Sequence, residues 1–185
     1  MKRTLPYLAI LLLLAAPQGC GEAEQGTRQE LGALTVAVPE GWEVQPPTSA
    51  MRKAQYGLPR QGSDGEDALL VVYHFGSNQG GSVDANLKRW YGQIRQPDGK
   101  STADLAQVST KQVSGMPVTV VDVTGTYAPS AMGPMVPAAP PKDGYRMVAA
   151  IVTTGEGDYY FKLTGPEHTV AYWQDSFHRF VDSIE

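Results

Sequence analysis

The chain has 185 residues, a formal charge of −4 and a single cysteine, Cys20. One cysteine excludes an intramolecular disulfide framework and a thiolate zinc site, so packing alone has to hold the core together. The Lys and Arg residues are scattered along the chain, which excludes the clustered basic patch of a nucleic-acid-binding protein. Residues 31–185 are enough for a single domain with a sizeable core.

The first twenty residues are typical of an exported protein. Two basic residues precede an apolar run over residues 8–16, which is too short to span a membrane and is typical of a secretory signal peptide. Cys20 follows this run, directly after Gly19, and the pattern resembles a bacterial lipobox. The resemblance implies a lipid anchor at Cys20 in the cell envelope, and Gly21 after it implies the outer membrane, facing the periplasm. The alternative is a chance cysteine beside an ordinary signal-peptidase site.

Cleavage of residues 1–19 removes the two positive charges of Lys2 and Arg3 and lowers the formal charge from −4 to −6. Residues 20–30 are polar and have no periodicity, so we expect a flexible tether that carries the acylated Cys20. The folded domain is expected to begin near Leu31 and to run to Glu185.

Alternating apolar residues predict strands over residues 34–38, 51–58 and 67–75. Both faces of the third strand are mostly apolar, which indicates that other layers cover the sheet on two sides. Two hairpins follow, one from residues 105–113 and 118–127, the other from residues 145–154 and 158–163 around a Gly-Glu-Gly turn.

Two helices are predicted. Ser82 is a good N-cap for a helix that reaches about Arg95, and Pro166 suits the first turn of a helix that runs to the C-terminus. The second helix carries one broad apolar stripe that has to pack on the sheet, made of Val170, Trp173, Phe177, Phe180, Val181 and Ile184. Residues 128–144 contain five prolines and predict a long exposed loop.

The order of these elements predicts an α+β domain with a mainly antiparallel β-sheet of about six strands packed between helices. Several segments, which combine core aromatics with turn glycines, also resemble uncharacterised exported bacterial proteins of the PsbP/Mog1-like superfamily: Pro39–Trp42, Met51–Arg52, Asn86–Gln93, Gly115, Gly125–Tyr127 and Phe161–Pro166. The resemblance implies an α/β/α sandwich and a binding or assembly role. It transfers no catalytic residue to this chain.

The helix that follows Ser82 carries the main binding candidates. Asn86, Arg89 and Gln93 recur at helical spacing, and with Trp90 they form a polar and aromatic ridge that could bind a protein partner or a small ligand. The alternative is that Trp90 belongs to the core and that its polar neighbours fix the helix to a loop.

The proline-rich loop contributes Met132 and Met135. Thioether sulfur is a soft copper ligand, but no His or Cys accompanies this pair, so we expect the two side chains to dock on the domain or on a partner.

One enzymatic alternative is centred on His74 and Asp84, because a histidine with a nearby carboxylate can hold a metal or act as a general base. The competing interpretation is a strand histidine that hydrogen-bonds at the sheet edge. The glycines before Ser82 could likewise expose helix N-terminal amides to an anion, or form only a flexible loop and an N-cap.

The sequence as a whole predicts a lipid-anchored, non-catalytic envelope protein that binds a protein partner or a small ligand. It predicts no cofactor, and the membrane is reached through the lipid on Cys20.

Overall fold

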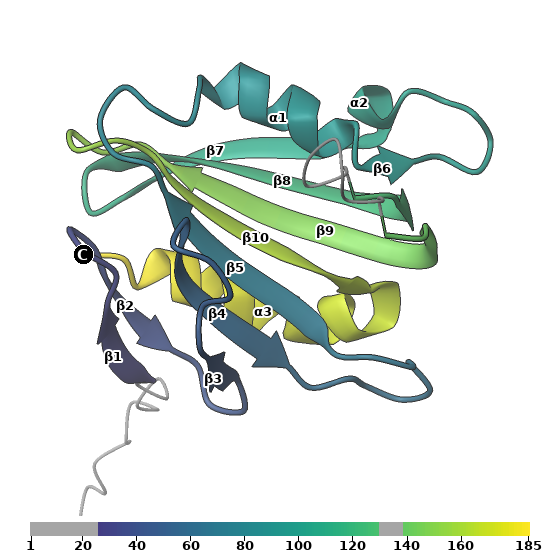
Figure 1. Ribbon diagram of the computed structural model, residues 1–185, viewed down its shortest axis with the longest axis horizontal. Helices are drawn as coiled ribbons and strands as arrows, with labels where there is room; N and C mark the ends of the chain where they lie inside the picture. Colours follow the sequence, from purple (N-terminus) through teal and green to yellow (C-terminus); the bar gives the residue numbers. More distant parts are fainter. Residues whose placement is uncertain (1–25, 130–138) are drawn as a thin grey trace, which may run out of the picture.

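The computed structural model describes residues 26–129 and 139–185, and within them the chain forms ten strands and three helices (Figure 1). The strands before the first helix are β1 (Thr27–Glu30), β2 (Thr35–Val38), β3 (Glu43–Gln45), β4 (Arg52–Leu58) and β5 (Ala68–His74). The rest of the chain forms α1 (Val83–Tyr91), β6 (Ile94–Arg95), α2 (Thr102–Leu105), β7 (Gln107–Val113), β8 (Met116–Tyr127), β9 (Lys142–Val152), β10 (Tyr159–Pro166) and α3 (Glu167–Asp182).

The main sheet has eight strands in the described part of the chain, and every neighbouring pair is antiparallel. Its order is β3-β4-β5-β10-β9-β8-β6, with β7 also paired to β8. The α+β class and the antiparallel sheet are confirmed, but the sheet is larger than the expected six strands. The additional edge strands β3 and β6 have three and two residues, too few for an alternating pattern to reveal them.

The C-terminal hairpin and helix form as predicted. β9 and β10 pair in a register that sets Phe161 opposite Ala150, and α3 begins directly after Pro166. The hairpin of β7 and β8 has a two-residue turn, Ser114 and Gly115. Both residues have positive φ (48° and 78°), as is typical of the tightest hairpin turns.

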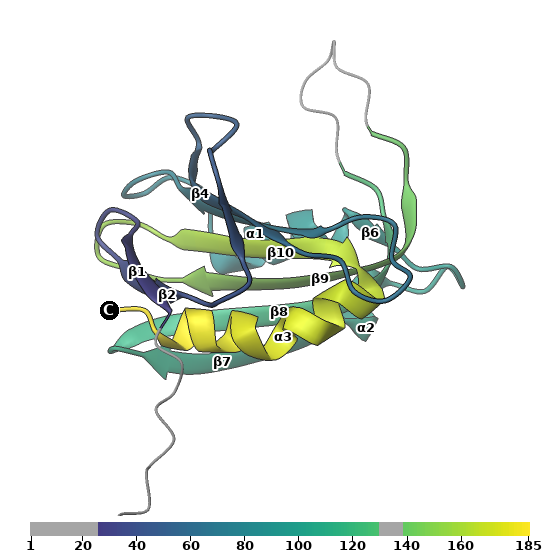
Figure 2. The same cartoon turned by 90° about the horizontal axis from the view of Figure 1, so that it is seen from below.

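Each face of the sheet has its own apolar core, as the two apolar faces of β5 predicted. On one face α3 packs against the sheet, with Phe177 and Phe180 fully buried. On the other face Trp90 of α1 packs against Val123, Met147 and Ile151. Figures 1 and 2 show α1 and α2 on one side of the sheet and α3 on the other. The sheet therefore lies between helices.

The first helix is shorter than predicted, because it ends at Tyr91 and not near Arg95. Gly92 caps it, and Ile94–Arg95 pairs with β8 as β6. Gly125 permits this pairing: a Cβ at that position would lie 2.7 Å from the carbonyl oxygen of Arg95. A close backbone approach from a distant strand thus ends the helical pattern. Leu105, expected to open a strand, instead ends the one-turn helix α2.

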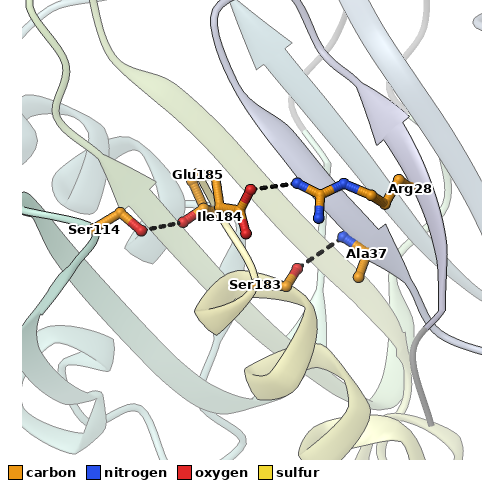
Figure 3. Close-up of polar contacts among 6 residues, drawn as sticks. All are labelled: Arg28, Ala37, Ser114, Ser183, Ile184 and Glu185. Carbon is orange, nitrogen blue, oxygen red and sulfur yellow. Dashed lines mark hydrogen bonds and ion pairs between the residues drawn. The ribbon is translucent and has the colours of Figure 1, made fainter.

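The folded domain begins earlier than expected. Residues 27–30, assigned from composition to the tether, form β1 and pair with β2. The C-terminus holds this hairpin in place (Figure 3): the Ser183 hydroxyl accepts from the Ala37 amide at 2.8 Å, and Arg28 pairs with Glu185. A polar strand of this kind has no apolar pattern in the sequence, so it can be recognised only from the strand and the C-terminal residues that it contacts.

Part of the proline-rich segment is strand, since β9 begins at Lys142. Met132 and Met135 lie outside the described residues, as does Cys20. Across residues 26–129 and 139–185, no helix combines the length and the apolar content that crossing a membrane requires.

Candidate functional site

A cleft of about 160 Å³ opens where α1 meets the sheet. We call it the α1 cleft and define it by its seven lining residues: Tyr73, Phe75, Arg89, Trp90, Gln93, Tyr160 and Lys162. Three of them, Arg89, Trp90 and Gln93, belong to the predicted binding helix. Of the others, Tyr73 lies in β5 and Phe75 directly after it, while Tyr160 and Lys162 lie in β10, the neighbour of β5 in the sheet.

Lys162 reaches the cleft because of strand alternation. Its neighbours Phe161 and Leu163 point into the α3 core, so the lysine side chain points to the opposite face. There it stands between Val71 of β5 and Ala149 of β9, its partners in the register, both apolar and buried. A charged side chain is therefore held over an apolar part of the central sheet.

The surroundings of Lys162 disfavour its charged form. Burial lowers the pKa of Lys162 to about 8, because leaving water penalises an ammonium more than a neutral amine. Its nitrogen donates to Oε1 of Gln93 and lies 5.2 Å from the centre of the Tyr127 ring. Of the ion pairs formed between described residues, none includes Lys162. The amine thus has neutral partners only.

Arg89 brings a second positive charge to the cleft. It lies on the exposed side of α1, and its guanidinium donates to Oδ1 of Asn86 at 2.7 Å. Asn86 is itself buried and donates to the carbonyl oxygens of Gly80 and Ser82, both at 2.9 Å. Asn86 therefore ties the start of α1 to the preceding loop and orients Arg89.

Aromatic rings form the apolar wall of the cleft. Tyr73 and Phe75 are stacked with ring centres 6.2 Å apart, and Phe75 lies 5.7 Å from Tyr160. Trp90 meets Tyr160 edge to face at 6.5 Å. Burial raises the pKa of the Tyr160 hydroxyl, which stays neutral and donates to the carbonyl of Gly81.

The predicted ridge is therefore only partly correct. Asn86 and Trp90 are 3% and 6% exposed, so they belong to the interior, as the alternative interpretation held. Arg89 and Gln93 border the cleft, and Gln93 accepts the hydrogen bond that the Lys162 amine donates. The sequence alone did not indicate Lys162. The one available signal was a lysine between Phe161 and Leu163 in a strand predicted to be covered.

A second, wider depression of about 470 Å³ lies beside the loop that precedes α1. Its lining is polar and comes from residues 77–82 and 154–158, among them Asp158. Ser82 caps the helix by accepting from the amide of Ala85 at 3.2 Å, so this loop has the plain N-cap arrangement. Among residues 26–129 and 139–185, no Lys or Arg side chain lines this depression.

His74 does not form a site with Asp84. Its Nδ1 contacts the carbonyl oxygen of Asp158 at 3.2 Å, and its ring stacks on Tyr159 with centres 4.1 Å apart. His74 is thus a hydrogen-bonded strand histidine, as the competing interpretation held, but β5 is an inner strand and the contact lies at its end and not at an edge of the sheet. Among the residues that the structure describes, no three His, Cys, Asp or Glu side chains are grouped closely enough to hold a metal ion.

Neither protein-family models nor curated proteins match this sequence. Among solved structures, the chain is similar to the solution structure of cyanobacterial PsbP (CyanoP) from Synechocystis: 12% identity, TM-score 0.51, covering 94% of this chain and 98% of that one. A Pseudomonas aeruginosa protein of unknown function, named as a candidate regulator, has 11% identity and TM-score 0.46, covering 85% of this chain and 94% of that one. A Bacteroides thetaiotaomicron protein has 12% identity and TM-score 0.47, covering 87% of this chain and 48% of that one. The chain thus has a PsbP/Mog1-like fold.

Proposed function

We propose that the protein is a lipid-anchored, non-catalytic component of the bacterial envelope, and that it binds a small ligand or a protein partner at the α1 cleft. The observation that carries the proposal is the ammonium of Lys162, held at a cleft between aromatic rings, where its partners among the described residues are neutral. An unpaired charge at such a position costs stability. A bound molecule would offset that cost.

The arrangement favours binding over catalysis. Burial alone can activate a lysine, but the described residues of the α1 cleft include no histidine, serine, cysteine or carboxylate that could act together with Lys162, so we favour binding.

The binding proposal is tested in living cells with the full-length protein. A photo-crosslinking amino acid at Phe75, in the cleft wall, should capture a specific molecule, whereas the same group at the exposed Lys100 should capture background only. Equal capture from both positions would count against the proposal.

The membrane anchor is tested separately. Cys20→Ser should abolish incorporation of a labelled palmitate analogue and move the protein from the outer-membrane fraction to the periplasmic fraction. A Cys20→Ser variant that stays on the membrane would show that acylation is not the anchor. Binding at the α1 cleft should survive this substitution, because the folded domain does not depend on the lipid.

A further inference from the structure

We propose that the α1 cleft binds a small aromatic carboxylate, a single flat ring that carries one negative charge. This inference rests on the proposed function and specifies the class of ligand. Three features of the cleft favour such a ligand: its charge, its wall and its size.

The charge of the cleft favours an anion. Lys162 and Arg89 both line it, and none of its lining residues in the described part of the chain carries a carboxylate. The chain as a whole is acidic, so this is a local reversal of sign. Charge attraction is stronger in a half-buried cleft than at an exposed surface because less water screens it. A carboxylate placed here would gain from both cations.

Both cations keep hydrogen-bond donors for a ligand. An ammonium has three donors, and Lys162 uses one of them on Gln93. A guanidinium has five donors in a planar fork, and Arg89 uses one nitrogen, Nη1, on Asn86. The fork geometry matches the two oxygens of a carboxylate. Asn86, buried and fixed by the loop carbonyls, orients the guanidinium before the ligand arrives.

The wall and the volume favour one ring. Tyr73, Phe75 and Tyr160 present apolar ring surface, on which a flat ring can stack or meet edge to face. The cleft volume of about 160 Å³ is close to that of a cavity that holds benzene, roughly 150 Å³. It is below the roughly 300 Å³ at which pockets for larger metabolites begin. The volume therefore favours a single ring over fused rings or nucleotides.

The test measures binding of benzoate to the full-length protein in detergent by calorimetry, with acetate and benzyl alcohol as matched probes. Benzoate should bind at one site. Acetate, which lacks the ring, and benzyl alcohol, which lacks the charge, should each bind at least about tenfold more weakly. Equal affinity for acetate would overturn the role of the aromatic wall, and equal affinity for benzyl alcohol would overturn the role of the charges.

Variants locate the site. Lys162→Met should weaken benzoate binding at least about tenfold, and Lys162→Arg should retain most of it, because the charge remains. Arg89→Gln, which removes an exposed charge, should also weaken benzoate binding. It serves as the test variant if Lys162→Met fails to fold. Lys88→Met, on the exposed side of the same helix, is the matched control and should leave affinity unchanged. The assignment would be overturned if Lys88→Met lost benzoate binding. It would also be overturned if Arg89→Gln and Lys162→Met both kept the benzoate affinity of the unmodified protein.

The two proposals can fail separately. If the crosslinker at Phe75 captures a specific molecule but benzoate does not bind, the ligand class is wrong and the binding role remains. If benzoate does not bind and the crosslinker captures background only, both proposals are wrong.

Discussion

Replacement of Lys162 by methionine should make the protein more stable near neutral pH. The pKa of this lysine falls from its ordinary value of 10.5 to about 8 in the folded chain, a difference of 2.5 units. At 1.36 kcal/mol per unit, charged Lys162 costs about 3 kcal/mol of folding free energy. Methionine has a similar length and carries no charge, so it removes this cost.

Two effects reduce the gain. The Lys162 side chain keeps some contact with water, and methionine leaves Oε1 of Gln93 without its donor, at a cost of about 1 kcal/mol. We therefore expect Lys162→Met to raise the free energy of unfolding by about 2 kcal/mol near pH 7.

The sign of the pH dependence follows from the lowered pKa. Below about pH 8 the lysine is charged in both the folded and the unfolded chain, and the full cost is present. Between about 8 and 10.5 the folded chain has lost the proton and the unfolded chain still binds it, so the cost declines as pH rises. The advantage of Lys162→Met should consequently be about 2 kcal/mol smaller at pH 9.5 than at pH 7.

Chemical denaturation of both proteins at the two pH values measures this difference. Lys88→Met, which removes an exposed lysine from α1, should change stability by less than about 0.5 kcal/mol at either pH. The reasoning would be refuted if Lys162→Met destabilised the protein at pH 7, or if its gain were the same at both pH values.

Three further substitutions test the packing of the fold. Ser183→Ala should lower the free energy of unfolding by about 1–2 kcal/mol, because the Ala37 amide in β2 loses its hydrogen-bond acceptor. Hydrogen exchange of that amide should become faster, and unchanged exchange would contradict the contact. Asp122→Asn should cost about 2 kcal/mol in urea unfolding, because the carboxylate pairs with Arg146 through two nitrogens in a half-buried position; an effect below 0.5 kcal/mol would make it an ordinary surface pair. Gly157→Ala should cost more than about 1 kcal/mol by thermal unfolding, since φ is 111° and a Cβ would lie 2.4 Å from a carbonyl oxygen, whereas Gly155→Ala in the same turn should be nearly neutral.

Local sequence patterns were enough to predict most of the elements. Ser82 and Pro166 marked the starts of α1 and α3, and alternation marked β2, β4, β5, β7, β8, β9 and β10 within a few residues. The elements that were missed, β1, β3, β6 and α2, have two to four residues each. These segments are too short for an alternating or helical pattern, and for β1 and β6 the decisive contacts come from the C-terminus and from β8, which no local pattern records.

The candidate site divides in the same way. Helical spacing in the sequence predicted that Arg89, Trp90 and Gln93 lie close together after Ser82, since that spacing is a local property of the chain. In the structure Arg89 and Trp90 belong to α1, and Gln93 lies just past its end at Tyr91. Only the tertiary structure decided that Trp90 turns inward and that Lys162 faces this helix. The position of Lys162 depends on the pairing of β10 with both β5 and β9, which places it over apolar residues far away in the sequence. The order of the strands in the sheet therefore decides that the charge of Lys162 is buried over apolar residues.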